Sequence, residues 1–348
     1  MSLYGAGNTK GQVHTIDHTS VGELLTDFPY LIRLGDLDTQ LHDAALSDFQ
    51  DSQCYDSGGS LLSRDITRYD GILDEGEMFV AVDISNLVDT TIQIEVGNGA
   101  SQGNDTATWT GAGYTGVWPL DGSNTDRVGV NNLTAVGALP STEGGVVGNA
   151  QRFNGSGYYD MSDTPTYVRK ELGARISFWV KRNDPHIKPY PTLFALRSDQ
   201  VQGFVCLSSV LPPYNYLSFG NNDSSFLRRR VNADFVDNLT KISINVGSDN
   251  SYEIYYNAVL KPTEASGGFQ PIAQINNIGA FKNDTSTSFE GLLDHFTIQD
   301  GTKSAAWEQR EYNNQSTFST NGIFALELRR KKSIFIPVLI NLVKRANV

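Results

Sequence analysis

The sequence has few cysteines and no long hydrophobic run. Its two cysteines, Cys54 and Cys206, are far apart in a chain of 348 residues and form no Cys-x-x-Cys pair, so zinc and thioredoxin-type chemistry are not supported. We favour two free thiols, and a single disulfide is the alternative. No run approaches the roughly 18 apolar residues that span a bilayer, so no transmembrane segment is predicted.

Several catalytic patterns are also missing. The chain has no Gly-x-Ser-x-Gly, no Gly-x-x-x-x-Gly-Lys and no His-Glu-x-x-His motif. Two carboxylate pairs remain as candidates for catalytic acids. Glu75 and Glu77 lie beside glycines and are interpreted as an exposed turn, and Glu308 and Glu311 are interpreted as the solvated face of a helix. We therefore expect a protein that is not an enzyme.

Charge and composition narrow the class further. The formal net charge of −12 repels phosphate, so nucleic acid is not an expected partner. Charged residues make up 19%, whereas glycine (33), tyrosine (15) and phenylalanine (17) are abundant, which is typical of a turn-rich all-β protein. The start lacks the basic and apolar regions of a secretory leader. Either a leader has been removed or the protein needs none, and the initial Met1 favours the second.

The hydrophobic pattern predicts four regions. Residues 1–24 are polar and are interpreted as an N-terminal arm. Residues 25–108 form a small β-domain with strands near 28–34, 78–84 and 91–96, and Pro29 is expected at a strand start, where its missing N–H costs least. Residues 109–324 form a β-sandwich, and residues 325–348 form a basic-apolar C-terminal tail.

Within 109–324, short β-rich runs are separated by Gly, Pro, Asn and Asp, which predicts two stacked sheets. The segment 289–300 is interpreted as the closing strand. Its apolar Phe296 and Ile298 alternate with His295 and Thr297, so one buried face is expected. A hairpin is predicted at 252–261 and a short helix in the first half of 307–318. The other expected strands lie near 176–180, 192–196, 203–207, 216–219 and 241–246.

Two sets of motifs resemble known families. The run Phe-Pro-Tyr-Leu-Ile-Arg-Leu at 28–34, the Asp-Ser-Gly-Gly turn at 56–59 and the strand at 92–98 resemble an uncharacterised β-domain that precedes concanavalin-like lectin domains. The runs Val-Trp-Pro-Leu-Asp, Gly-Asn-Ala-Gln-Arg-Phe-Asn-Gly, Ile-Ser-Phe-Trp-Val-Lys and Gly-Leu-Leu-Asp-His-Phe resemble, in that order, a laminin-G-like, concanavalin A-like module. Residues 307–318 are similar to the closing segment of its bacterial and phage members.

The resemblance implies an all-β fold, a laminin-G/concanavalin-like jelly-roll β-sandwich with a smaller N-terminal β-domain. It implies a place among bacterial surface and bacteriophage structural proteins and brings no catalytic residue. Glycoside hydrolases with related folds use a Glu-x-Asp-x-x-Glu strand whose carboxylates act about 5–5.5 Å apart. This chain has no such run.

Two kinds of binding site are candidates. Lectin-like sandwiches often hold Ca²⁺ in rim loops, and oxygen donors are available here at Asp121, Asn124, Asp126 and Asp294. The alternative is that these residues cap turns. Glycan binding would use exposed aromatic residues, for which the candidates are Tyr158, Tyr190 and Tyr214, together with Tyr159 and Tyr216; packing in the core is the alternative.

The tail is basic on an otherwise acidic chain. It could be a closing strand, a subunit contact or a membrane-surface contact, and the subunit contact would pair its charges with an acidic neighbour. The candidate assembly residues are Arg329, Arg330, Lys331, Lys332 and Phe335. We predict a non-enzymatic structural or adhesive surface protein, a bacteriophage virion component that contacts other virion subunits or itself, with a cell-surface glycan as a further partner. A secreted bacterial adhesin is the alternative, ahead of a glycoside hydrolase.

Overall fold

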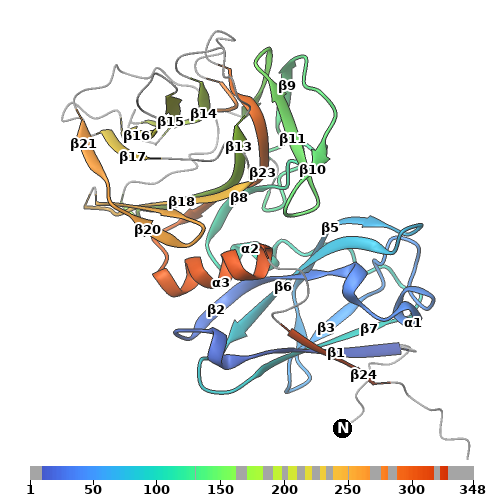
Figure 1. Cartoon of the computed structure of the whole chain (residues 1–348). Coiled ribbons are helices and arrows are strands. Elements are labelled where there is room, and N and C mark those ends of the chain that lie inside the picture. The colour runs from blue at the N-terminus through green and yellow to red at the C-terminus, as the bar shows by residue number, and fades with distance from the viewer. Residues whose placement is uncertain are drawn as a thin grey trace, which may run out of the picture.

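The computed structural model describes residues 10–129, 131–161, 171–182, 191–197, 203–209, 216–221, 228–232, 238–249, 251–266, 276–280, 288–316 and 322–327. The chain folds into an N-terminal β-unit and a larger β-sandwich, with helix α3 (Ala305–Ser316) lying where the two units meet (Figure 1). The predicted all-β sandwich fold is confirmed.

The N-terminal unit has two sheets that share one apolar cluster. A five-stranded sheet has the order β24-β1-β7-β3-β4, and a three-stranded sheet has the order β2-β6-β5. The strands predicted near 28–34, 78–84 and 91–96 correspond to β2, β6 and β7. The bounds are β1 (Lys10–Ile16), β2 (Leu25–Arg33), β3 (Gln53–Tyr55), β4 (Leu61–Leu62), β5 (Arg64–Asp70), β6 (Glu75–Ile84), β7 (Thr90–Val96) and β24 (Gly322–Glu327), with short helices η1 (His18–Ser20), η2 (Leu34–Asp36) and α1 (Thr39–His42).

The predicted N-terminal arm is wrong for residues 10–16. These residues form β1, which pairs antiparallel with β7 on one side and with β24 on the other. The buried face of β1 carries Gln12 and His14 beside Ile16, so two polar residues concealed the strand pattern. The predicted tail also begins inside a strand, because β24 extends beyond residue 325.

Pro29 lies inside β2 rather than at its start, because the strand begins at Leu25. The position is tolerated because β2 is the edge strand of its sheet and pairs with β6. A proline there leaves no ladder donor missing toward a second neighbour.

His14 on β1 is buried and predicts an acid-sensitive fold. Its Nε2 lies 3.0 Å from the Tyr30 hydroxyl. Burial, with a smaller contribution from Arg310, lowers the pKa of His14 to about 4. Between pH 6.5 and 4 the unfolded chain therefore binds a proton that the folded protein does not, so stability rises with pH in this window and is lost as pH falls.

We expect His14 to contribute about 2 kcal/mol to the loss of unfolding free energy between pH 7 and pH 5. Urea denaturation at pH 7, 6 and 5 measures this slope, and His14→Gln should reduce it. His18→Gln on the solvent-accessible η1 turn is the matched control. A slope that is the same in His14→Gln and in the wild type would contradict the prediction.

The β-sandwich stacks two sheets over a second apolar cluster. One has the order β10-β11-β23-β13-β18-β19-β20, with β8 paired to β23, and the other has the order β21-β17-β16-β15-β14-β22-β12-β9. Phe178, Phe194 and Phe296 meet between them, with ring centroids 5.4–5.8 Å apart. Helix α2 (Ala107–Thr110) precedes the strands, which are β8 (Tyr114–Trp118), β9 (Thr134–Gly137), β10 (Glu143–Gly144), β11 (Asn149–Asn154), β12 (Gly157–Met161), β13 (Ala174–Arg182), β14 (Thr192–Arg197), β15 (Gly203–Ser209), β16 (Tyr216–Asn221), β17 (Arg228–Asn232), β18 (Thr240–Val246), β19 (Tyr252–Tyr256), β20 (Val259–Lys261), β21 (Glu264–Ser266), β22 (Asn276–Ile278) and β23 (Glu290–Asp300).

The predicted hairpin joins β19 and β20. Its two turn residues, Asn257 and Ala258, have positive φ values of 48° and 63°. Positive φ at both central positions matches the right-handed twist of the flanking strands. This hairpin forms one edge of its sheet.

Strand β23 is buried on both faces, which corrects the expectation of a single buried face. Phe296 and Ile298 belong to the sandwich core. His295, on the opposite face, is 1% exposed and stacks on Phe79 of β6 with ring centroids 5.1 Å apart. The N-terminal unit therefore covers the face that we expected to meet solvent.

Helix α3 joins the two units. The Asn314 side chain accepts from the Leu31 N–H at 2.7 Å and donates to the Leu31 carbonyl at 2.9 Å, as a neighbouring strand would. Trp307 packs edge-on against Phe28, which lies with Leu31 on β2. On its other side the helix contacts β13, because Arg175 Nε donates to Glu308 Oε1 at 2.7 Å.

Glu308 and Glu311 are not on a solvated face, contrary to the sequence-based interpretation. They are 1% and 2% exposed and form ion pairs with Arg175, and Glu311 pairs with Lys241 as well. Burial alone would raise the pKa of Glu311, but Arg175 and Lys241 hold that pKa well below its ordinary value. The helix is polar in sequence because its buried acids pair with Arg175 and Lys241 and its buried Asn314 bonds to the β2 backbone.

Cys54 is a buried free thiol, and burial raises its pKa to about 12. The side chain of Cys206 lies outside the described part of the chain, as do Tyr190 and Tyr214. The assembly residues of the tail, Arg329, Arg330, Lys331, Lys332 and Phe335, also lie outside it. Among the helices that the structure describes, none has the length and apolar character of a membrane span.

Candidate functional site

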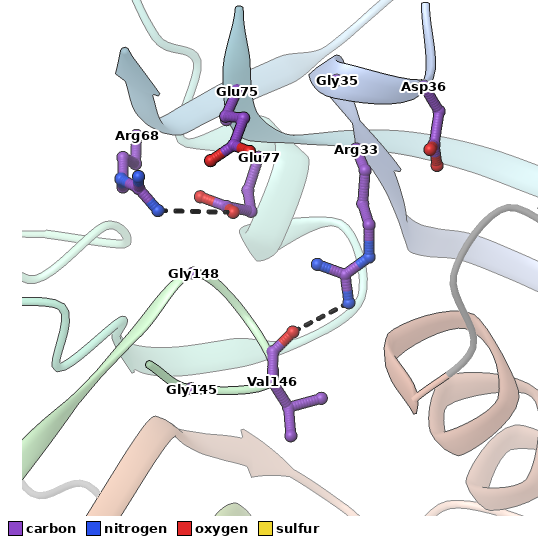
Figure 2. Close-up of a pocket in the computed structure, with 10 residues that line it drawn as sticks. Arg33, Gly35, Asp36, Arg68, Glu75, Glu77, Gly145, Val146 and Gly148 are labelled. Carbon is purple, nitrogen blue, oxygen red and sulfur yellow. Dashed lines mark hydrogen bonds and ion pairs between the residues drawn. The ribbon is translucent and has the colours of Figure 1, made fainter. Parts of the chain in front are cut away.

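A pocket of about 320 Å³ opens where the N-terminal unit meets the sandwich (Figure 2). Its walls come from the end of β2 with η2, from the β5–β6 hairpin and from the turn between β10 and β11. Small-molecule sites in proteins commonly have volumes of about 300–1,000 Å³, so this pocket fits a single small group. The lining residues are Arg33, Gly35, Asp36, Arg68, Glu75, Gly76, Glu77, Gly145, Val146 and Gly148.

Arg33 ties the pocket to both units. Its Nη2 donates to the Val146 carbonyl at 2.8 Å and to the Gln315 carbonyl at 2.7 Å. The first bond fixes the Gly145–Gly148 turn against the N-terminal unit, and the second fixes the end of α3. The spacing between the walls of the pocket is therefore set by direct hydrogen bonds.

Gly148 permits the close approach of the turn to Glu77. Its φ is +72°, a conformation that favours glycine, and a Cβ at this position would lie 2.9 Å from Glu77 Oε2. The turn is closed by a hydrogen bond from the Gly145 N–H to the Gly148 carbonyl at 2.9 Å. Glycine at 148 thus leaves space for the carboxylate that faces the cavity.

Glu77 is the buried acid of the pocket. It is 6% exposed, and its nearest cation is Arg68, with Nη1 3.9 Å from Oε1 (Figure 2). That distance is too long for a hydrogen bond. Burial raises the pKa of Glu77; Arg68 and Arg33 oppose the shift, and Asp121 and Glu75 add to it. The interpretation of Glu75 and Glu77 as an exposed turn is therefore wrong for Glu77, which lies in β6.

Two further carboxylates complete the rim. Asp36 is the last residue of η2 and is half-buried, and burial raises its pKa while Arg33 opposes the shift. Glu75 is exposed at the start of β6. Together with Glu77, Arg33 and Arg68, these groups make a polar pocket lined by three carboxylates and two guanidinium groups.

Asp294, a predicted metal ligand, lies behind the Gly145–Gly148 turn. Its Oδ2 accepts from the Val146 N–H at 2.7 Å and from the Val147 N–H at 2.9 Å. It is fully buried, and burial raises its pKa to about 8 despite these two bonds, with Glu77 and Asp121 adding to the shift. Asp294 therefore acts in the structure as the residue that holds the turn.

The other predicted calcium ligands make local turn contacts. Asp121 Oδ1 accepts from the Ser123 N–H, and Asp126 Oδ1 accepts from the N–H groups of Val117 and Val128. The Asn124 backbone carbonyl accepts from Leu133. These contacts match the turn-capping alternative, and Ca²⁺ binding stays a prediction.

In the described part of the chain, the acidic and histidine side chains that converge closely enough for a metal are Asp17, His18 and Asp89. These residues lie on the surface and include none of the predicted ligands. Asp17 already accepts from the Thr19 N–H as the cap of η1, and Asp89 accepts from the His18 N–H.

Tyr158 does not provide a platform for a sugar ring. It is 4% exposed, and Tyr159, which is 3% exposed, belongs to the sandwich core. The sequence-based search missed Arg33, Asp36, Arg68 and Gly148. The Gly-Val-Val-Gly turn and the alternating Glu75 and Glu77 were the available signals.

The fold and the pocket define a two-unit all-β protein with a polar site between its units. No protein-family model matches the chain, and no curated protein matches it by sequence. Solved structures with some likeness include domain 4 of AbnA, a GH43 extracellular arabinanase from Geobacillus stearothermophilus, in complex with arabinotriose. It is 18% identical over 57% of this chain and 97% of that one, with a TM-score of 0.45.

Two toxin domains show a comparable likeness. The binding domain of Paraclostridial Mosquitocidal Protein 1 is 12% identical over 58% of this chain and 52% of its own, with a TM-score of 0.44. The receptor binding domain of botulinum neurotoxin mosaic serotype C/D is 13% identical over 59% and 51%, also with a TM-score of 0.44. This chain thus spans about half the length of each toxin domain.

Proposed function

We propose that this chain is a non-enzymatic structural or adhesive surface protein, of the kind found in bacteriophage virions, and that it binds a glycan in the pocket between its two units. The pocket is the observation that carries the proposal. It brings charged side chains of the N-terminal unit and the Gly145–Gly148 turn of the sandwich around one cavity, with Arg33 holding the walls together. The virion assignment rests on the resemblance of the sandwich sequence to laminin-G-like modules of phage proteins.

The chemistry of the pocket suits hydroxyl groups. Carboxylates accept hydrogen bonds from vicinal hydroxyls, and guanidinium groups donate to ring and hydroxyl oxygens. Glu77 and Arg68 face the same cavity 3.9 Å apart, so one sugar unit could bond to both. None of the described residues that line the pocket is aromatic, so hydrogen bonding rather than ring stacking would select the ligand.

Gly148→Ala tests this proposal. The new methyl group would push the Glu77 carboxylate into the cavity, so we expect glycan binding to weaken at least tenfold. The positive φ should also lower the free energy of unfolding by about 1 kcal/mol. Glycan-array screening of the full chain, followed by calorimetry on the best ligand, measures the change in affinity.

Gly99→Ala is the matched control. Gly99 has a similar φ of +70°, and no atom lies within 4 Å of a Cβ at that position, so the variant has the same backbone cost without altering the pocket. Equal glycan affinity in Gly148→Ala and Gly99→Ala would show that the pocket is not the glycan-binding site. Failure of the wild-type protein to bind any glycan would overturn the proposed function.

A further inference from the structure

Among the described residues that line the pocket, carboxylates outnumber guanidinium groups. Asp36, Glu75 and Glu77 line it, against Arg33 and Arg68. Burial raises the pKa values of both Glu77 and Asp36, which reflects the unfavourable negative charge held there. A bound group with positive charge would relieve that cost.

Both cations already have partners. Arg33 Nη2 donates to two backbone carbonyls, those of Val146 and Gln315. Arg68 lies beside Glu77, and this ion pair keeps the charge of Arg68 near the Glu77 carboxylate. Neither guanidinium is positioned to offer its whole charge to an anionic ligand.

The carboxylates, in contrast, accept no hydrogen bond from the part of the chain that the structure describes. Glu77 is more than nine-tenths buried and faces the cavity between Arg68 and the Gly148 turn (Figure 2). A buried carboxylate that accepts no hydrogen bond is costly unless a donor reaches it. A ligand that enters the cavity can therefore donate to Glu77 in place of water.

We infer that the glycan unit that enters this pocket is an amino sugar with a free ammonium group, which donates to Glu77 while its hydroxyls bond to Asp36 and Glu75 at the rim. This inference rests on the proposed function and specifies its ligand class. An ammonium group supplies up to three donors and one positive charge, and that charge matches the one carboxylate by which the described lining exceeds its two guanidinium groups. An N-acetylated sugar lacks the charge, and a uronic acid has the wrong one.

The net charge of the whole chain also favours a positively charged ligand. With a formal net charge of −12, the protein attracts polycationic glycans at long range and repels polyanionic ones. Attraction of this kind should weaken with salt, whereas a contact with the buried Glu77 should be screened much less. A pocket-specific component of binding should therefore persist at 0.5 M NaCl.

The test is calorimetric titration of the full chain with four probes, at low salt and at 0.5 M NaCl. The probes are a glucosamine trisaccharide, its N-acetylated counterpart, a galacturonate trisaccharide and spermidine. We expect the glucosamine trisaccharide to bind at least tenfold more tightly than the N-acetylated one. Glu77→Gln should lose at least tenfold of that affinity, and Glu171→Gln, an exposed carboxylate of the sandwich, should lose none.

The outcomes separate this inference from the proposed function. If the N-acetylated or galacturonate probe binds as tightly as the glucosamine probe and Gly148→Ala weakens it, the amino-sugar assignment fails and the glycan pocket stands. If spermidine binds as tightly and Glu77→Gln abolishes its binding, the ligand is a polyamine and both fail. Asp36→Asn provides a second variant should Glu77→Gln not fold, and unchanged affinity in it would overturn the assignment.

Discussion

Replacing Arg175 with methionine is expected to lower the free energy of unfolding by about 3–5 kcal/mol, the cost of removing one partner from a buried ion pair. Arg175 is fully buried; its Nε and Nη2 donate to the two oxygens of Glu308 at 2.7 and 2.8 Å, and Nη2 also donates to Glu311. Burial alone would lower the pKa of Arg175, but Glu308 and Glu311 raise it well above its ordinary value. Without the guanidinium, two buried carboxylates would share the single cation of Lys241.

Arg152→Met is the matched control. Arg152 pairs with Glu143 on the surface, where the side chains are 45% and 43% exposed, and such pairs contribute about 0–1 kcal/mol. Urea unfolding followed by tryptophan fluorescence compares the two variants. The double variant Arg175→Met with Glu308→Met should recover part of the loss, because it leaves no unpaired charge at position 308. A loss in Arg175→Met no greater than that in Arg152→Met would show that the buried network does not stabilise α3.

The buried ion pairs of Arg175 and Lys241 are connected to the pocket through helix α3. Gln315, on the last turn of α3, accepts from Lys241 Nζ at 2.6 Å and from Trp179 Nε1 at 2.8 Å through its side chain. Its backbone carbonyl accepts from Arg33, which lines the pocket. Helix α3 thus connects the ion pairs of β13 and β18 to the wall of the proposed binding site, so a loosened helix should also weaken ligand binding.

The strands could be predicted from the sequence where their buried faces are apolar. The run at 176–180 predicted β13 because large apolar residues dominate it. Strand β1 was missed because Gln12 and His14 lie on its buried face, and their burial depends on distant partners. Gln12 accepts from the Asp38 N–H, and His14 meets the Tyr30 hydroxyl. A local pattern carries no information about such partners.

The pocket could not be predicted for the same reason. Arg33 and Val146 are 113 residues apart in sequence, yet the bond between them sets one wall of the cavity. The sequence shows that Glu75 and Glu77 alternate along a strand, but not that Gly148 lies over Glu77. Asp294 was identified as an unusual acid from the sequence alone. Its role as a turn anchor depends on the two N–H groups that reach it from a separate hairpin.

Asp294→Asn is expected to stabilise the protein at pH 8 by about 5 kcal/mol, the free energy that corresponds to a pKa shift of this size. The pKa of Asp294 is raised from 3.8 to about 8 by burial. Between these values the folded protein retains a proton that the unfolded chain has released. Stability therefore falls as pH rises from about 4 to about 8 and changes no further above that.

Asparagine has the same shape and no charge, so its Oδ1 can accept from Val146 and Val147 at every pH. The gain should therefore be near zero at pH 4 and should increase up to pH 8, which urea denaturation at pH 4, 6 and 8 would measure. His14 and His295 shift stability in the opposite direction below pH 6.5, but they are common to both proteins and cancel in the difference. Asp249→Asn on an exposed turn is the control and should show no such increase. No gain at any of these pH values would mean that Asp294 is ionised in the folded protein throughout, with its charge stabilised by the Val146 and Val147 N–H groups.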